Sequence, residues 1–123
     1  MENELLLRYI LPEELFKYFD LVSIDETSPN ELTLYLDEKK SAPPEHKDKS
    51  LVSYGFDEPK KIQDFPLRKK SVYLIVRRRK WKDKATGKIY SRTWDLTASG
   101  TSYSNEFAVF LKGLFGQIPD KFQ

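Results

Sequence analysis

The sequence predicts one α+β domain over residues 1–123, in which a small, mainly antiparallel sheet of hairpins is flanked by an N-terminal and a C-terminal helix. Apolar residues recur at helical spacing near the two ends of the chain, and period-2 alternation dominates between them. The chain has no cysteine, which excludes a disulfide framework and a thiolate metal site. With 39% hydrophobic and 14% aromatic residues, it can still form a modest core.

The first part, residues 1–67, is predicted to be an acidic unit of one helix and several strands. Apolar residues keep helical spacing over residues 4–19, and Pro12 followed by two glutamates favours a helix from Pro12 to Tyr18. Alternation and turn signals predict the other elements, which in order are a strand at 20–26, a strand at 31–37, a loop at 39–49, a strand at 51–56 with a bulge at Gly55, and a strand at 62–67.

The second part, residues 68–103, is predicted to be a basic β-hairpin without metal. Apolar residues alternate from Val72 onwards, Asp83 and Gly87 supply turn chemistry, and residues 88–96 return as the second strand. Eleven Lys and Arg residues lie from position 68 to position 92 against a single acidic residue, although the whole chain carries a net charge of only +2. Such segregated charge predicts a polyanionic partner.

The third part, residues 104–118, is predicted to be an amphipathic helix. Ser104 is a suitable N-cap, and an apolar stripe at i, i+3, i+4, i+7 and i+8 starts at Phe107. No apolar run approaches the length of a transmembrane helix, and the N-terminus lacks a signal-peptide pattern. We therefore expect a cytoplasmic protein with no membrane partner.

A two-stranded ribbon is narrow enough to enter the major groove of DNA, and alternation predicts which of its side chains would contact that polyanion. Alternation places Arg77, Arg79 and Trp81 on one face and Arg78 and Lys80 on the other, and we expect the first face to matter more. The predicted DNA-binding residues are Arg77, Arg78, Arg79, Lys80, Trp81, Lys82, Lys84, Lys88 and Arg92. The alternative is a charged tip held out in solvent, with the tryptophans packing the hairpin, a role that suits Trp94 better than Trp81.

No catalytic set is visible in the sequence. His46 lies in a polar, proline-containing loop with no nucleophile beside it, and the five glycines form no phosphate-binding loop. The carboxylates cluster at strand ends, where they usually keep an edge soluble. We therefore expect no enzymatic activity, no metal and no cofactor in this chain.

A resemblance to a known family is carried by the segments IQDFPLRKKSVYLIVRRRKW, DKATGK and SRTWDL and by residues 100–112. They resemble the short transposase N-terminal region proteins of some bacterial insertion sequences, which are similar to the zinc-ribbon domain of Asp-Asp-Glu transposases. In that domain an I-x-D-L-P phrase precedes an arginine-rich strand, an aromatic residue and a Cys-x-x-C-G knuckle. Here Asp83 and Thr86 stand at the cysteine positions, so the resemblance implies a ribbon without zinc.

The resemblance implies a DNA-binding, nucleoid-associated part of a transposition system, with double-stranded DNA at the transposon ends as one partner. Catalysis would lie in a separate transposase subunit or domain, the second partner. An alternative is a protein-interaction module that docks this catalytic subunit through the acidic N-terminal half and the tail at residues 115–122. A third possibility, a small RNA-binding regulator, lacks the expected platform of stacking aromatic residues.

Overall fold

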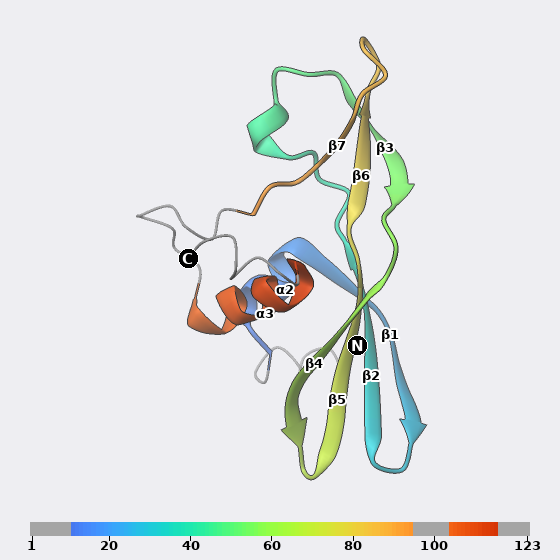
Figure 1. Cartoon of the computed structure of the whole chain (residues 1–123), viewed down its shortest axis with the longest axis vertical. Coiled ribbons are helices and arrows are strands. Elements are labelled where there is room, and N and C mark those ends of the chain that lie inside the picture. Colours follow the sequence, from blue (N-terminus) through green and yellow to red (C-terminus); the bar gives the residue numbers. More distant parts are fainter. Residues whose placement is uncertain (1–10, 95–103, 116–123) are drawn as a thin grey trace.

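The computed structural model describes residues 11–94 and 104–115, and it has the α+β architecture predicted from the sequence (Figure 1). Two helices accompany two sheets in the described part of the chain. The elements are α2 (Glu13–Tyr18), β1 (Phe19–Ser28), β2 (Glu31–Glu38), the short 3-10 helix η1 (Pro44–His46), β3 (Leu51–Phe56), β4 (Lys60–Leu67), β5 (Lys70–Arg77), β6 (Arg79–Asp83), β7 (Ile89–Ser91) and α3 (Asn105–Phe115).

The larger sheet has four strands in the order β1-β2-β5-β4. β1 with β2 and β4 with β5 are antiparallel pairs, whereas β2 and β5 are parallel, so the mainly antiparallel expectation holds with one exception. Both helices lie on the same face of this sheet (Figure 1). The core between sheet and helices includes Leu34 and Leu36 from β2, Leu74 and Val76 from β5, and Phe107 from α3.

The smaller sheet has three strands in the order β3-β6-β7. It lies beyond the larger sheet along the same ribbon, because β3 leads into β4 and β5 leads through Arg78 into β6 (Figure 1). The backbone N–H of Asp57 donates to the carbonyl of Arg78 at 2.7 Å, which keeps the two chain segments paired where one sheet gives way to the other.

The prediction of a single hairpin from residue 71 to residue 96 is wrong in its pairing. β5 lies between β2 and β4 in the larger sheet, and only β6 and β7 form a hairpin with each other. The reason is burial, because the alternate apolar residues Val72, Leu74 and Val76 are at most 2% exposed beneath the helices. Residues 95 and 96, the end of the predicted second strand, lie outside the described residues.

The turns follow two different rules. In the β6–β7 hairpin the Asp83 carboxylate accepts from the N–H of Ala85 at 3.0 Å and from the Thr86 hydroxyl at 3.2 Å, and Gly87 takes a φ of 75°, as its turn chemistry predicts. Between β4 and β5, Arg68 and Lys69 form a two-residue turn with φ values of 51° and 69°. This turn therefore lies at the predicted boundary between the acidic part (residues 1–67) and the basic part (residues 68–103).

The predicted helix ends are confirmed where the structure describes them. α2 starts directly after Pro12, and the Ser104 hydroxyl caps α3 by accepting from the N–H of Phe107 at 3.1 Å. Glu14 of α2 accepts from the Ser104 N–H at 2.6 Å and from its hydroxyl at 2.9 Å, which ties the two helices together. The helical expectation for residues 4–10 and 116–118 falls outside the described residues. No helix in the described ranges is long and apolar enough to cross a membrane.

Candidate nucleic-acid interface

One face of the three-stranded sheet is covered by the chain segment between β2 and β3. This covered face consists of Leu51, Ser53, Trp81, Asp83 and Tyr90, and cross-strand register places these residues on the same side. The segment at residues 39–50 packs against it, with the His46 ring 4.7 Å from the Tyr90 ring and the Lys49 ammonium 5.2 Å from it. Trp81 is therefore only 4% exposed.

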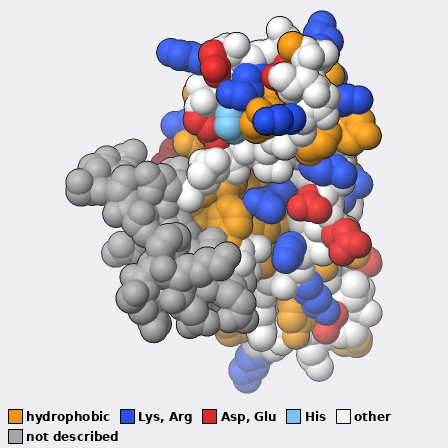
Figure 2. Space-filling model, turned by 45° about the horizontal axis from the view of Figure 1, so that its top comes forward, with side chains coloured by type: hydrophobic (Ala, Val, Ile, Leu, Met, Phe, Trp, Pro, Cys, Tyr) orange, Lys and Arg blue, Asp and Glu red, His pale blue; other side chains and the backbone are white. Residues whose placement is uncertain are grey.

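The opposite face carries no such cover from the described residues and is called the open face here. By register and alternation it consists of Val52, Tyr54, Lys80, Lys82, Ile89 and Ser91. Three of its side chains are unusually exposed for their type, since Val52 is 39%, Tyr54 50% and Ile89 45% accessible. Figure 2 shows the end of the molecule that carries the smaller sheet, where Lys and Arg side chains lie among hydrophobic and some acidic side chains.

The open face and the adjoining β6–β7 turn carry four ammonium groups. They belong to Lys80, Lys82, Lys84 and Lys88. Among the described residues none of the four forms an ion pair, although six other basic residues do. Asp83 does not offset them on this surface, because its carboxylate is buried and accepts hydrogen bonds within the turn. The surface therefore presents positive charge without a nearby compensating carboxylate.

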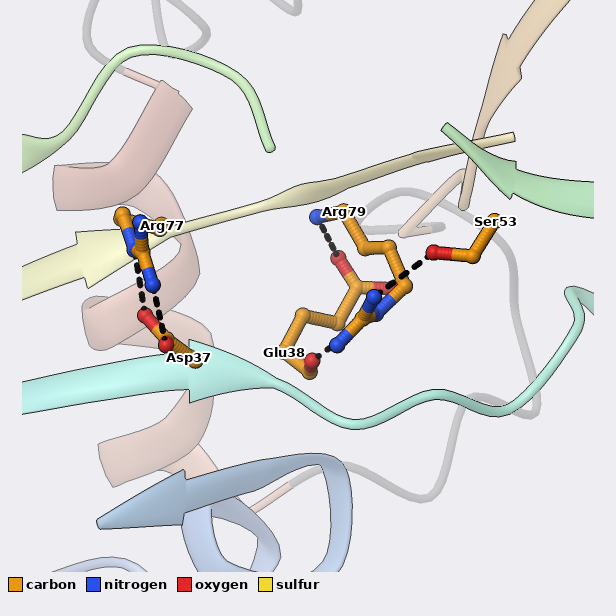
Figure 3. Close-up of polar contacts among 5 residues, drawn as sticks. All are labelled: Asp37, Glu38, Ser53, Arg77 and Arg79. Carbon is orange, nitrogen blue, oxygen red and sulfur yellow. Dashed lines mark hydrogen bonds and ion pairs between the residues drawn. The ribbon is translucent and has the colours of Figure 1, made fainter. Parts of the chain in front are cut away.

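Arg77 and Arg79 are held by Asp37 and Glu38 at the end of β2 (Figure 3). The Arg77 guanidinium donates to both oxygens of Asp37, at 2.7 and 2.6 Å, in a bidentate pair. The Arg79 guanidinium donates to the Glu38 carbonyl at 3.3 Å and to the Ser53 hydroxyl at 2.7 Å. Both guanidinium groups also lie over the Phe56 ring, at 4.1 and 4.5 Å. These two arginines, which the sequence favoured for DNA contact, connect the two sheets.

Arg78 and Arg92 also have partners within the chain. The Arg78 guanidinium lies 3.5 Å from the Asp57 carboxylate and 4.8 Å from the centre of the Phe115 ring on α3. Arg92 donates to the Ser41 carbonyl at 3.1 Å, and its Nε lies 3.5 Å from the Glu38 carboxylate. The nine predicted DNA-binding residues thus divide into four arginines bound internally, one buried tryptophan and four lysines without an ion-pair partner.

Glu38 is the most deeply buried carboxylate at the junction of the two sheets, with 2% exposure. Burial raises the pKa of Glu38 above its ordinary value, against the opposing effects of the Arg79 N–H, which donates to it at 3.1 Å, and of the positive charge of Arg92. By accepting from the Arg79 N–H, the Glu38 carboxylate connects β6 to β2.

Tyr54 is a candidate contact residue that the sequence reasoning missed. The ammonium groups of Lys80 and Lys82 lie 5.7 and 5.3 Å from the centre of its ring. Alternation along 51–56 could have indicated that Tyr54 and Val52 share a face, but the sequence alone does not tell which face is covered.

The positions that correspond to the zinc knuckle in the resemblance are occupied by a hydrogen-bonded turn. The Thr86 hydroxyl donates to the Asp83 carboxylate and accepts from the N–H of Lys88 at 3.2 Å. Within the described ranges, no three His, Asp or Glu side chains lie close enough together to hold a metal ion.

Comparisons with known proteins find no matching protein family, no similar curated protein and no similar solved structure. The transposase resemblance therefore rests on the sequence segments quoted above.

Proposed function

We propose that this chain binds DNA as the non-catalytic, N-terminal part of an insertion-sequence transposase, and that its three-stranded sheet meets the DNA. The observation that carries the proposal is the set of four lysines on the open face and its adjoining turn, none of which has an ion-pair partner among the described residues. The resemblance supplies the transposition context, in which the protein acts at the element ends and associates with the nucleoid while catalysis lies in another chain or domain.

The chemistry of the lysines suits phosphate contact. An ammonium group is a compact point charge that neutralises a phosphate without reading a base, so these contacts position the protein on DNA. The narrow β6–β7 hairpin, with Lys84 and Lys88 at its turn, is of a size that can enter a major groove. Arg77 and Arg79 contribute indirectly by holding β6 in place.

The test is a salt series with a fluorescent duplex of the element end, read by anisotropy. Each phosphate contact contributes a slope of roughly −0.9 to log K against log salt. We expect Lys80→Ala, Lys82→Ala, Lys84→Ala and Lys88→Ala each to reduce the magnitude of the slope by about this amount, with similar losses on element-end and random duplexes.

A matched control removes the same charge from the opposite end of the ribbon. The double variant Arg68→Asn/Lys69→Gly loses two positive charges at the β4–β5 turn, and Lys84→Ala/Lys88→Ala loses two at the β6–β7 turn. Only the second should lower affinity substantially. Equal losses for both pairs, or no loss for any lysine variant, would remove the three-stranded sheet from the DNA interface.

A second candidate function, docking of the catalytic subunit, is favoured by an apolar pocket of about 220 Å³ between α3 and β4. Leu67, Val109 and Phe110 are among its apolar lining residues, and its carboxylates Asp64 and Glu106 form no ion pair with described residues. A basic, apolar segment of the catalytic chain would complement such a pocket. Val109→Lys should then weaken co-purification with the catalytic chain and leave duplex binding unchanged, whereas unchanged co-purification would exclude the pocket.

A further inference from the structure

The open face carries a feature that duplex binding does not need, an exposed aromatic ring with two ammonium groups close to it. The Tyr54 ring is half exposed, and the Lys80 and Lys82 ammonium groups approach it to 5.7 and 5.3 Å. Val52 and Ile89 lie on the same face and are also exposed. The face therefore combines a π surface, apolar surface and positive charge.

A β-bulge in β3 accompanies the outward position of Tyr54. The register between β3 and β6 shifts between Ser53 and Phe56, and Gly55 within this shift has a φ of 80°. A Cβ at Gly55 would meet nothing within 4 Å, so the backbone conformation, not lack of space, is the reason for glycine here. Bulges of this kind change the direction of neighbouring side chains.

The ligand that matches this combination has an exposed π face with phosphates beside it. Bases in a duplex are stacked on one another, so a duplex held at this face through its phosphates offers no free base to Tyr54. An unpaired nucleotide can stack its base on Tyr54 while neighbouring phosphates reach Lys80 and Lys82.

We propose that the open face binds single-stranded nucleic acid, with an unpaired base stacked on Tyr54 and the adjacent phosphates held by Lys80 and Lys82. The inference rests on the proposed function, since it uses the same surface, and it adds single-stranded nucleic acid as a second class of ligand. The shared chemistry of base and phosphate is common to DNA and RNA, and the experiment therefore includes both.

The test compares one labelled oligonucleotide as single-stranded DNA, as single-stranded RNA and as duplex DNA, by anisotropy. Tyr54→Leu should weaken single-strand binding roughly ten- to a hundredfold, the range expected for loss of one stacked base, and this loss should exceed its loss of duplex affinity. Tyr54→Phe keeps the ring and should bind single strands like the wild type. Circular dichroism of each variant confirms folding.

The matched control is Tyr73→Leu in the larger sheet. Tyr73 also lies beneath a lysine, with the Lys61 ammonium 4.3 Å from its ring centre, but away from the open face. This variant should leave single-strand binding unchanged.

The outcomes separate the inference from the proposed function. If Tyr54→Leu leaves single-strand binding unchanged while the lysine variants weaken duplex binding, the stacking inference fails and the proposed function stands. If Tyr54→Leu and Tyr73→Leu weaken single-strand binding equally, the stacking inference also fails. Binding to the RNA strand alone, with loss in Tyr54→Leu, supports the stacking site and overturns the DNA assignment.

Discussion

The two sheets share one continuous ribbon but bury opposite sets of alternate residues. In β5 the even positions Val72, Leu74 and Val76 are buried under the helices. In β6 the odd positions Trp81 and Asp83 are buried instead, under the segment at 39–50. Arg78 belongs to neither strand, and the buried set changes there from even to odd positions.

The change of covered side explains where the charge ends up. The larger sheet uses its apolar face for a core with α2 and α3. At its end the Arg77 guanidinium pairs with the Asp37 carboxylate, and the Arg79 guanidinium donates to the Glu38 carbonyl and the Ser53 hydroxyl. The smaller sheet has no helix on its open face among the described residues, and Lys80 and Lys82 are half-buried there beside the exposed Val52 and Ile89. The first sheet therefore supplies stability, and the second supplies the surface proposed for binding.

The largest expected effect on stability comes from removing an aromatic ring from α3, which covers the larger sheet. Phe107 is 0% exposed, so Phe107→Ala should lower the free energy of unfolding by about 3–5 kcal/mol. Val52→Ala on the open face should change it by about 0.5 kcal/mol or less. Urea denaturation followed by circular dichroism measures both. Similar losses for the two variants would contradict the division of roles between the sheets.

The next largest effect is expected at the junction between the sheets. Glu38→Ala removes the carboxylate that pairs with Arg92 and accepts from the N–H of Arg79, so it should cost about 3 kcal/mol in unfolding free energy. Because Glu38 connects β6 to β2, we also expect weaker DNA binding under conditions where the variant is still folded. A folded variant with wild-type stability and affinity would show that the junction is not held by this group.

A smaller, pH-dependent effect tests the protonation of Glu38. Its folded-state pKa is raised above the ordinary value of 4.5, mainly by burial, so the folded protein binds a proton more readily than the unfolded chain does. The stability of the wild type relative to Glu38→Gln should therefore rise as the pH falls from neutral towards 4.5 and change little below that value. Urea denaturation of both proteins across this range measures the difference, and the opposite trend would indicate a lowered pKa.

The smallest expected effect is a stabilisation at the β4–β5 turn. Arg68 and Lys69 both have positive φ values, a conformation that costs non-glycine residues free energy and that Asn-Gly adopts readily. Arg68→Asn/Lys69→Gly should therefore raise the unfolding free energy by about 0.5–1 kcal/mol, after the greater flexibility of glycine in the unfolded chain is subtracted. Thermal denaturation checks this, and a lowered melting temperature would show that the arginine and lysine side chains stabilise the turn.

Local sequence patterns were sufficient for elements whose partners lie close in the chain. The start of a helix after Pro12, the Ser104 cap, the strand at 51–56 with its Gly55 bulge, and the turn from Asp83 to Gly87 all follow from such patterns. In each case the deciding interactions are backbone preferences or hydrogen bonds within a few residues. The resulting α+β class is confirmed by the structure.

The tertiary structure alone decided which face of the basic ribbon is accessible. The Arg77 guanidinium donates to the carboxylate of Asp37, 40 residues away, and the Arg79 guanidinium to the carbonyl of Glu38, 41 residues away, because β5 pairs in parallel with β2. Trp81 is buried because a distant loop covers its side of β6. Period-2 alternation assigns the residues of a strand to two faces, but it does not tell which of the two faces is buried. Only the long-range pairing and the covering segment make one face core and leave the other, with Tyr54 and its lysines, open.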